Sequence, residues 1–491
     1  MKYILSIDAG TTSSRAILFD KNGQQQAIAQ YEFPQYFPQE SWVEHNANEI
    51  WTTQLKAIRE VVATQGVSID EIAAMGITNQ RETTIIWDRQ TGEPVHNAIV
   101  WQDRRTASIC ADLSPHTDTF LAKTGLVLDA YFSGTKIKWI LDHDLAIRQK
   151  AEAGELAFGT VDSWLIWNLT DGKIHTTDVT NASRTLLFNI HTLEWDQALL
   201  KLLDIPASLL PQVVSSSETV GHSSEKLFGK ALPISGIAGD QQAALFGQLC
   251  TQAGEVKNTY GTGCFCIMNT GEKAVRSKNK MLTTIGWQIN GKVTYALEGS
   301  VFIAGALVQW LRDQLQLIGA APEIEALAET VEDNGGVTFV PALAGLGAPF
   351  WDPDATGSIM GITRGTQKGH IARAALEAIA LRSREIIVEM QKDAGVEFPS
   401  LKVDGGASNN NLLMQIQADL LNKRVIRPNT TETTALGAAF FAGLAVGFWK
   451  DENELKSIWK EDRTFTPDAG AQTQHILRLW EQRLPKVLKN N

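Results

Sequence analysis

The chain has 491 residues, of which 44% are hydrophobic and 20% are charged, and it carries a formal net charge of -11. This length exceeds the size at which a single hydrophobic core keeps growing, so we expect two domains. The acidic balance argues against binding to nucleic acid or to an anionic membrane, because both need a basic protein face.

The cysteines and the uncharged segments argue against disulfide-rich, zinc-binding and membrane-spanning classes of protein. The four cysteines are too few and too scattered for a disulfide framework or a four-cysteine zinc site. The longest uncharged run, 435–449, is shorter than the ~20 residues that a membrane-spanning helix needs, and we expect it to form a tightly packed interior helix. The N-terminus has no signal-peptide pattern, so we expect a soluble protein in the cytoplasm.

The first predicted element is a β-hairpin with a polar turn. Two apolar runs, Tyr3–Asp8 and Arg15–Phe19, flank the turn Gly10–Ser14. Its glycine allows a phosphate to approach the backbone, and the N–H groups and hydroxyls supply donors. Asp8 is expected to hold Mg²⁺ through water, since Mg²⁺ keeps several waters beside one or two carboxylates, and Arg15 adds a cation. A plain hairpin with a polar turn is the alternative interpretation.

The same arrangement returns later in the chain. Strands predicted at Val256–Tyr260 and Cys264–Met268 flank the turn Gly261–Gly263. Between the two modules, 234–247 predicts a buried strand, a glycine turn and a helix that begins near Asp240. The recurrence predicts a duplicated architecture, in which two glycine–threonine hairpins clamp a polyphosphate.

Helices predicted by their period alternate with strands, which favours α/β layers. We expect them at Ala47–Thr64, Lys136–Leu145, Phe302–Leu317, Ile371–Asp393 and Asn411–Leu421. A third glycine cluster, 405–406, follows a short apolar strand and precedes the last of these helices, which places backbone donors at a helix N-terminus. A tight turn is the alternative, but three such turns together indicate a nucleotide site. Neither a P-loop nor a GxGxxG motif is present.

At this point the residues resemble the FGGY family of sugar and polyol kinases, within the superfamily of actin, hexokinase and the heat-shock chaperones. The resemblance runs through nearly the whole chain, in the segments Ile7–Arg15, Thr78–Thr84, Trp101–Thr106, Thr180–Thr185, Gly239–Gln242, Asn258–Phe265, Gly345–Asp352 and Val403–Gly406. It implies an α/β fold of two ribonuclease H-like, actin-like ATPase domains with a nucleotide and substrate cleft between them. We expect these domains at 1–250 and 251–450, followed by a peripheral helical segment at 451–491.

The segments around Arg81, Trp101 and Asp240 point to glycerol as the phosphate acceptor within this family. The resemblance implies a polar lining and an apolar wall, formed by Arg81, Glu82, Tyr131, Asp240 and Gln241 and by Trp101 and Phe265. A triol offers three hydroxyls that such side chains match, while aromatic rings cover its carbon edge. A surface ion pair is the alternative for Arg81 and Glu82, and a core position is the alternative for Trp101.

Asp240 is the expected catalytic residue. The resemblance implies that it is the general base that accepts the proton of the attacking hydroxyl and orients that hydroxyl toward the γ-phosphate. The alternative is a helix N-cap, because Gly239 and Asp240 precede an alanine-rich helix.

The resemblance also implies that MgATP is the second substrate. The expected nucleotide-binding residues are Thr11, Thr12, Ser13, Arg15, Thr262, Gly305, Gln309, Gly406 and Asn410. Gly305 and Gln309 lie one helical turn apart and would face the same way. The expected partners are therefore glycerol and ATP, with no nucleic acid and no membrane insertion, in a homodimer or homotetramer.

Regulation known for some glycerol-phosphorylating members is not expected here. Inhibition by fructose 1,6-bisphosphate uses a loop with glycine and arginine, whereas 225–232 has no arginine and fewer glycines. Activation by histidine phosphorylation is not expected either, since the neighbours of His222 do not match. Two other functions stay open: an FGGY kinase for a pentulose or another polyol, and an actin-like or chaperone-like ATPase that acts as a scaffold.

Overall fold

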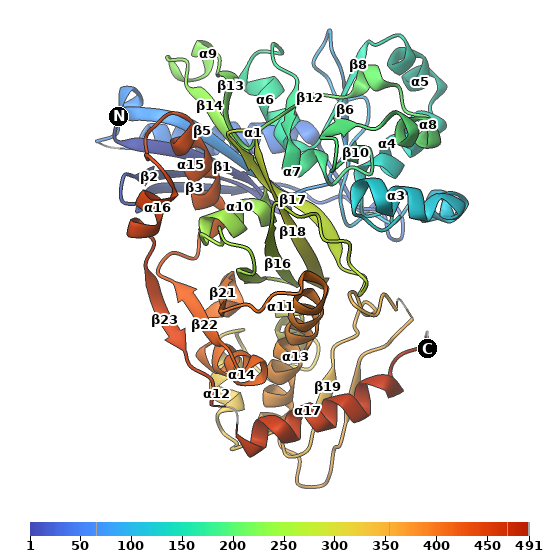
Figure 1. Cartoon of the computed structure of the whole chain (residues 1–491), viewed down its shortest axis with the longest axis vertical. Helices are drawn as coiled ribbons and strands as arrows, with labels where there is room; N and C mark the ends of the chain where they lie inside the picture. Colours follow the sequence, from blue (N-terminus) through green and yellow to red (C-terminus); the bar gives the residue numbers. More distant parts are fainter. Residues whose placement is uncertain (65, 353, 469, 490–491) are drawn as a thin grey trace.

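Two α/β halves lie one above the other along the long axis of the molecule (Figure 1). The computed structural model describes residues 1–64, 66–352, 354–468 and 470–489. A mixed sheet of 13 strands runs through both halves. Its first half contains, in spatial order, β3 (Gln25–Glu32), β2 (Ser13–Asp20), β1 (Tyr3–Ala9), β5 (Ile72–Asn79), β14 (Pro233–Gly239) and β13 (Ser217–His222). Its second half continues with β17 (Leu282–Ile289), β18 (Lys292–Val301), β16 (Cys264–Gly271), β15 (Val256–Tyr260), β21 (Ser400–Asp404), β22 (Arg424–Pro428) and β23 (Glu461–Phe465).

The two halves repeat one strand topology. In the first half, β2 pairs antiparallel with β1 and β3, while β5 pairs parallel with β1 and β14. In the second half, β16 pairs antiparallel with β15 and β18, while β21 pairs parallel with β15 and β22. The duplicated architecture predicted from the two hairpins is therefore confirmed. The halves meet where Ser217 of β13 pairs with Ile289 of β17.

Each hairpin predicted to carry a phosphate turn has the expected form. In the first, Ala9 pairs with Ser14, and the Gly10 N–H donates to the Ser13 carbonyl at 2.9 Å. In the second, Tyr260 pairs with Cys264, and the Gly261 N–H closes the turn at 2.9 Å. The flanking strands are buried almost throughout, so each turn projects from a rigid base.

Two short helices, α10 (Asp240–Gly247) and α15 (Thr433–Ala445), pack closely against each other, with α15 in the upper half of Figure 1. Glycine is required at their contact, because a Cβ on Gly437 would lie 1.8 Å from the Ala243 carbonyl oxygen. The helix α15 also lies against the sheet of the first half, where Ser6 Oγ donates to the Ala435 carbonyl at 2.7 Å. The interior helix predicted from the uncharged run is thus confirmed.

The other predicted helices are present, four with shifted ends and the last, 411–421, with the predicted bounds. They are α1 (Ala47–Val62), α4 (Ser133–His143), α11 (Gly305–Asp313), α13 (Lys368–Ala394) and α14 (Asn411–Leu421). The helix α4 ends before Leu145 because Asp144 caps the next helix, α5 (Leu145–Glu152), through the N–H groups of Ala146 and Ile147.

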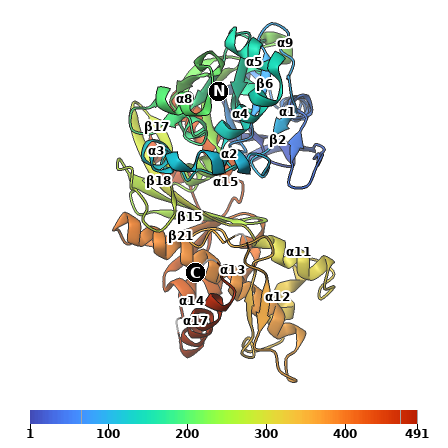
Figure 2. The ribbon, with the colours of Figure 1, turned by 90° about the vertical axis from the view of Figure 1, so that its right-hand side faces the viewer.

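The C-terminal segment differs from the helix that its composition predicts. It contains α16 (Glu452–Ile458) and α17 (Ala471–Arg483), but residues 461–465 form β23, which pairs with β22 at the edge of the sheet. The turned view in Figure 2 places α17 beside α13 and α14 in the lower half. Among the helices of the described residues, none combines the length and the apolar character needed to cross a membrane.

Candidate active site

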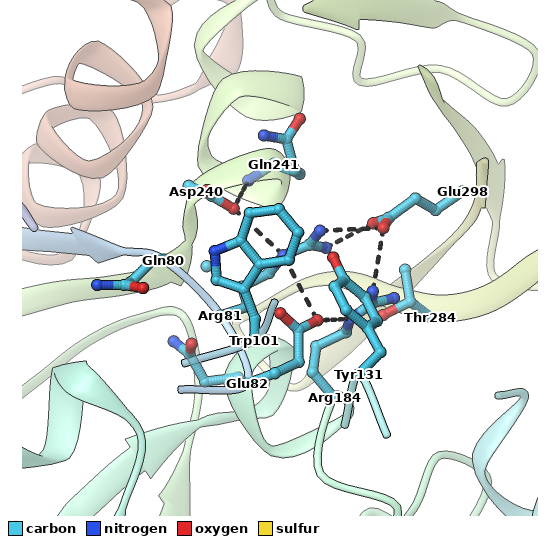
Figure 3. A network of polar contacts seen from close by, with 12 residues as sticks. Gln80, Arg81, Glu82, Trp101, Tyr131, Arg184, Asp240, Gln241, Thr284 and Glu298 are labelled. Carbon is cyan, nitrogen blue, oxygen red and sulfur yellow. Dashed lines mark hydrogen bonds and ion pairs between the residues drawn. The ribbon is translucent and has the colours of Figure 1, made fainter. Parts of the chain in front are cut away.

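A group of charged side chains gathers where three distant parts of the chain meet (Figure 3). Arg81 and Glu82 lie in the loop between β5 and β6 (Ile85–Asp88), Asp240 begins α10, and Glu298 lies in β18. The Arg81 guanidinium is fully surrounded: its Nη1 and Nη2 donate to Glu298 Oε2 and Oε1 at 2.5 and 2.9 Å. Its Nε lies 3.2 Å from Asp240 Oδ1, so one guanidinium connects both carboxylates.

Glu82 is held in an uncommon backbone conformation at this site. Its φ of 62° lies in the left-handed region, which costs free energy for a residue with a side chain. Ser133 Oγ donates to its carbonyl oxygen at 2.9 Å, and Arg184 Nε donates to its Oε1 at 2.6 Å. The conformation turns the Glu82 carboxylate into the protein, where it is 1% exposed, so the alternative of a surface ion pair with Arg81 is wrong.

Asp240 occupies the first turn of α10 and not the N-cap, which is Gly239. Its Oδ1 accepts a hydrogen bond from the Gln241 N–H at 2.7 Å, and 32% of its side chain is exposed. Burial raises the pKa of Asp240 to about 6, and Glu82 adds to this effect, while Arg81, the Gln241 N–H and Lys257 oppose it. The carboxylate is therefore mostly ionised at neutral pH, open on one side, and suited to accept a proton.

Three aromatic rings border the charged group. The Trp101 ring lies edge-on to Tyr131 and Phe265, with centroid distances of 5.6 and 6.3 Å. The Trp101 indole N–H donates to Thr11 Oγ1 at 3.0 Å. Trp101 thus touches the first glycine–threonine turn and the strand that follows the second, which brings the two predicted turns to one place.

Gln241, predicted in the acceptor lining, has its side chain directed elsewhere. Its amide oxygen accepts a hydrogen bond from Lys257 Nζ at 2.5 Å, and Figure 3 shows the amide pointing away from Arg81. Lys257 Nζ also lies 2.6 Å from Thr259 Oγ1, which in turn donates to Asp404 Oδ1 at 2.5 Å. Gln241 thus connects the Asp240 helix to the strands that support the second turn.

The second turn, the start of α11 and the third glycine cluster lie together. The Gly305 N–H donates to the Gly261 carbonyl at 2.9 Å, and a Cβ at Gly305 would lie 2.6 Å from that oxygen. Gly405, with a φ of 83°, packs on Tyr260, where a Cβ would lie 2.6 Å from the carbonyl oxygen. A Cβ on Gly406, by contrast, would meet no atom within 4 Å. This space beside Gly406 is open to a ligand.

The other predicted nucleotide-binding residues differ in their exposure and in the hydrogen bonds that they already form within the protein. Thr12, Thr262 and Gln309 are exposed and Ser13 is buried. Asn410 is the N-cap of α14, and its side-chain oxygen accepts from the Leu413 N–H at 2.7 Å, which leaves its NH₂ group for other partners.

Asp8 and Arg15 form an ion pair beside the first turn. Arg15 Nη2 donates to Asp8 Oδ2, and Arg15 Nη1 donates to Glu432 Oε2 at 2.6 Å. Among the described residues no three His, Cys, Asp or Glu side chains form a metal-binding cluster. A single buried carboxylate fits Mg²⁺, which takes its other ligands from phosphate and water.

Two charged residues of the site were not singled out in the sequence. Glu298 stands among apolar residues of β18, a pattern that indicates a buried, paired carboxylate but not its partner. Arg184 lies in one of the segments that carry the family resemblance, yet its pairing with Glu82 and Glu298 depends on the tertiary structure.

Sequence comparison identifies family models over most of the chain. The N-terminal domain of the FGGY family of carbohydrate kinases matches residues 3–247, and the C-terminal domain of that family matches residues 256–446. A protein of Deinococcus radiodurans named glycerol kinase is 58% identical over 488 residues, covering 99% of this chain and 97% of the relative. A glycerol kinase of Oleidesulfovibrio alaskensis is 61% identical over 97% of this chain and 96% of its own.

Solved structures give the same picture. The crystal structure of Plasmodium falciparum glycerol kinase with ADP matches with a TM-score of 0.94 at 38% identity, covering 100% of this chain and 99% of that one. Xylulose kinase from Lactobacillus acidophilus matches with a TM-score of 0.88 at 23% identity, over 99% of this chain and 98% of that one. The second match concerns the fold alone.

Proposed function

The chain belongs to the FGGY family of carbohydrate kinases, and from this membership we propose that it transfers the γ-phosphoryl group of ATP to glycerol. The product is sn-glycerol 3-phosphate. The observation that carries this proposal is the compact acceptor group: the Arg81 guanidinium and the carboxylates of Glu82 and Asp240 beside the rings of Trp101 and Phe265. The Asp240 carboxylate, held by Arg81 and open on one side, beside an aromatic wall suits the hydroxyls and the carbon edge of a small triol.

The chemical step follows from the ionised Asp240 carboxylate and its open side. A primary hydroxyl of glycerol donates a hydrogen bond to the free edge of the carboxylate and is thereby aimed at the γ-phosphorus. As the hydroxyl oxygen bonds to phosphorus and the bond to the leaving ADP oxygen breaks, Asp240 accepts the proton. Because phosphoryl-transfer transition states are loose, orienting the hydroxyl contributes more than removing its proton early.

The nucleotide would lie between the turns of both halves. The N–H groups and hydroxyls of 10–14 and 261–263 supply donors to the phosphates, and the open space at Gly406 lies near the start of α14. Asp8 would hold Mg²⁺ through water, and this ion, when bound, supplies positive charge to the phosphate oxygens.

Three further expectations remain part of this proposal. They are the domain limits 1–250, 251–450 and 451–491, a homodimeric or homotetrameric state, and a place in the cytoplasm, where ATP is the ordinary phosphoryl donor. Size measurement by light scattering tests the oligomeric state.

A coupled assay of ADP release tests the function directly. Glycerol should stimulate ADP release strongly, whereas a pentulose such as xylulose should stimulate it weakly. A preference for the ketose would replace glycerol by another FGGY substrate. ATP hydrolysis that ignores glycerol and accompanies polymerisation or peptide binding would favour the scaffold function.

A further inference from the structure

Two arginines and two glutamates form a closed ionic group that shares Arg81 and Glu82 with the acceptor group. Arg81, Glu82, Arg184 and Glu298 have side chains that are 2, 1, 0 and 1% exposed. Such burial of charges is costly unless each charge has well-placed partners, and removal of one charge leaves another unpaired. The four residues balance in charge, and their contacts determine which part of Arg81 reaches the partly exposed neighbour, Asp240.

Glu298 binds the two terminal nitrogens, Nη1 and Nη2, of the Arg81 guanidinium. Its two oxygens accept from Nη1 and Nη2 at 2.5 and 2.9 Å, the bidentate arrangement that fixes both the position and the plane of an arginine. Gln242 Oε1 adds a contact to Nη1 at 3.1 Å. Arg184 Nη2 donates to Glu298 Oε1 at 3.0 Å and fixes the carboxylate from the other side.

Because both terminal nitrogens of Arg81 bind Glu298, Asp240 contacts Arg81 through Nε. The contact runs from Nε to Asp240 Oδ1 at 3.2 Å, and Oδ1 is also the atom that accepts from the Gln241 N–H. Both partners therefore share one oxygen. An arginine that was free to turn would offer two nitrogens to both carboxylate oxygens, and this arrangement would withdraw the carboxylate from a substrate hydroxyl.

We propose that Glu298 is a positioning residue, which holds Arg81 so that Asp240 keeps one carboxylate oxygen for the acceptor hydroxyl. The proposal rests on the proposed function of the same site. Glu298 lies in β18 of the second half, whereas Arg81 and Asp240 lie in the first, so the second half contributes to the acceptor site through Arg81 (Figure 3).

The charge state of Asp240 reports on this arrangement. The charged groups that act on Asp240 are Arg81 and Glu82 from the loop after β5 and Lys257 from β15. In Glu298→Gln, Arg81 loses its bidentate partner and turns toward Asp240, so the pKa of Asp240 falls. Repulsion by Glu82 and attraction by Lys257 remain in the variant. The loss of the Glu298 charge lowers the pKa of Asp240 in the same direction as a turned Arg81, so Glu298→Asp, which keeps that charge, isolates the effect of Arg81.

The experiment compares Glu298→Gln with Glu377→Gln in the ADP-release assay with glycerol. Glu377 is also a buried glutamate of the second half, where it accepts from Asn334 Nδ2 at 2.7 Å, and it lies outside the acceptor group. We expect Glu298→Gln to lower kcat/KM for glycerol by about 100-fold, the usual effect of misplacing a reacting group. The acidic limb of its pH profile should move down by about one pH unit. Glu377→Gln should keep the wild-type limb.

A variant that loses activity while keeping the wild-type limb would overturn the positioning role and leave Glu298 as a structural residue. Glu298→Asp decides between positioning and loss of charge, whether or not Glu298→Gln folds, because it keeps the charge but reaches only one nitrogen of Arg81. Its limb should move in the same direction by less, and an unmoved limb would refute the proposal. Absence of glycerol-dependent ADP release in the wild type would instead refute the proposed function itself.

Discussion

The indole N–H of Trp101 donates a hydrogen bond to Thr11 Oγ1 at 3.0 Å, and this bond joins the aromatic wall to the first glycine–threonine turn. The wall is predicted to contact the acceptor and the turn is predicted to contact the nucleotide. One hydrogen bond thus connects the two proposed substrate sites. A change at either site is therefore expected to alter the binding of both substrates.

The first prediction concerns this connection. Trp101→Phe removes the donor and keeps an aromatic ring, and it should raise the KM for ATP as well as that for glycerol. A net hydrogen bond contributes about 1 kcal/mol, so the rise in the KM for ATP should be about fivefold. Initial rates with either substrate varied, at saturating concentration of the other, measure both constants.

A double-mutant cycle supplies the control for this bond. Thr11→Val removes the acceptor, and the double variant with Trp101→Phe should be less impaired than the sum of the two single effects. Thr11→Ser keeps the hydroxyl and should behave like the wild type. Additive effects, or an unchanged KM for ATP in Trp101→Phe, would show that the bond does not connect the sites.

The second prediction concerns Asp240 as general base. Asp240→Asn should lower kcat by about 10²–10⁴-fold, the range typical of a lost general base, while glycerol still binds. Calorimetric titration with glycerol and single-turnover kinetics separate binding from chemistry. Asp118→Asn, a substitution at an aspartate whose side chain is 97% exposed, serves as the control. Near-normal turnover in Asp240→Asn would rule out the base.

The third prediction is the pH dependence of the wild type. Burial raises the pKa of Asp240 to about 6, and only the ionised carboxylate accepts a proton. The value of kcat/KM should therefore be constant above pH 7 and fall about tenfold per pH unit below pH 6. Asp240→Asn should lack this limb. A limb that persists in that variant would assign it to another group.

The fourth prediction contrasts two adjacent glycines. A Cβ on Gly406 meets no protein atom within 4 Å, so Gly406→Ala should leave thermal unfolding unchanged and raise the KM for ATP, by about tenfold if a ligand group fills that space. Gly405→Ala places a Cβ 2.6 Å from the Tyr260 carbonyl oxygen at a φ of 83°, and should destabilise the fold by about 1–3 kcal/mol. An unchanged KM for ATP in Gly406→Ala would remove Gly406 from the nucleotide site.

The fifth prediction concerns stability at Asp162, which is fully buried in the first half. Its oxygens accept from Thr160 Oγ1 and Thr177 Oγ1 at 2.5 and 2.6 Å. Burial raises its pKa from 3.8 to about 7, against the effect of these bonds. The folded state therefore binds the proton more tightly than the unfolded state, so this group's stabilisation is full below pH 4 and is lost as the pH rises to 7.

Asp162→Asn removes this titration while its amide can still bond to both threonines. The free energy of unfolding of the wild type should fall between pH 4 and 7 by on the order of 4 kcal/mol more than that of the variant. Thermal unfolding of both proteins across this range measures the difference. Parallel curves would show that Asp162 is ionised throughout.

Much of the fold was predictable because its signals are local. The hairpins at 3–19 and 256–268, the helix that begins at Asp240 and the interior helix of 435–449 all follow from residues within a few positions of one another. The strand β23 was missed because four of its five residues are polar and only Phe465 is buried, and the segment becomes a strand only by pairing with β22.

The sequence by itself determined the family, the two repeated hairpins and the carboxylate at the start of α10, since each depends on short patterns with a fixed local geometry. Only the tertiary structure decided which charges meet. Arg81 and Glu298 are 217 residues apart, and the chain has 55 acidic residues among which the sequence names no partner. Their pairing depends on the register of β18 and on the loop after β5, because an ion pair forms only where the fold brings two side chains together.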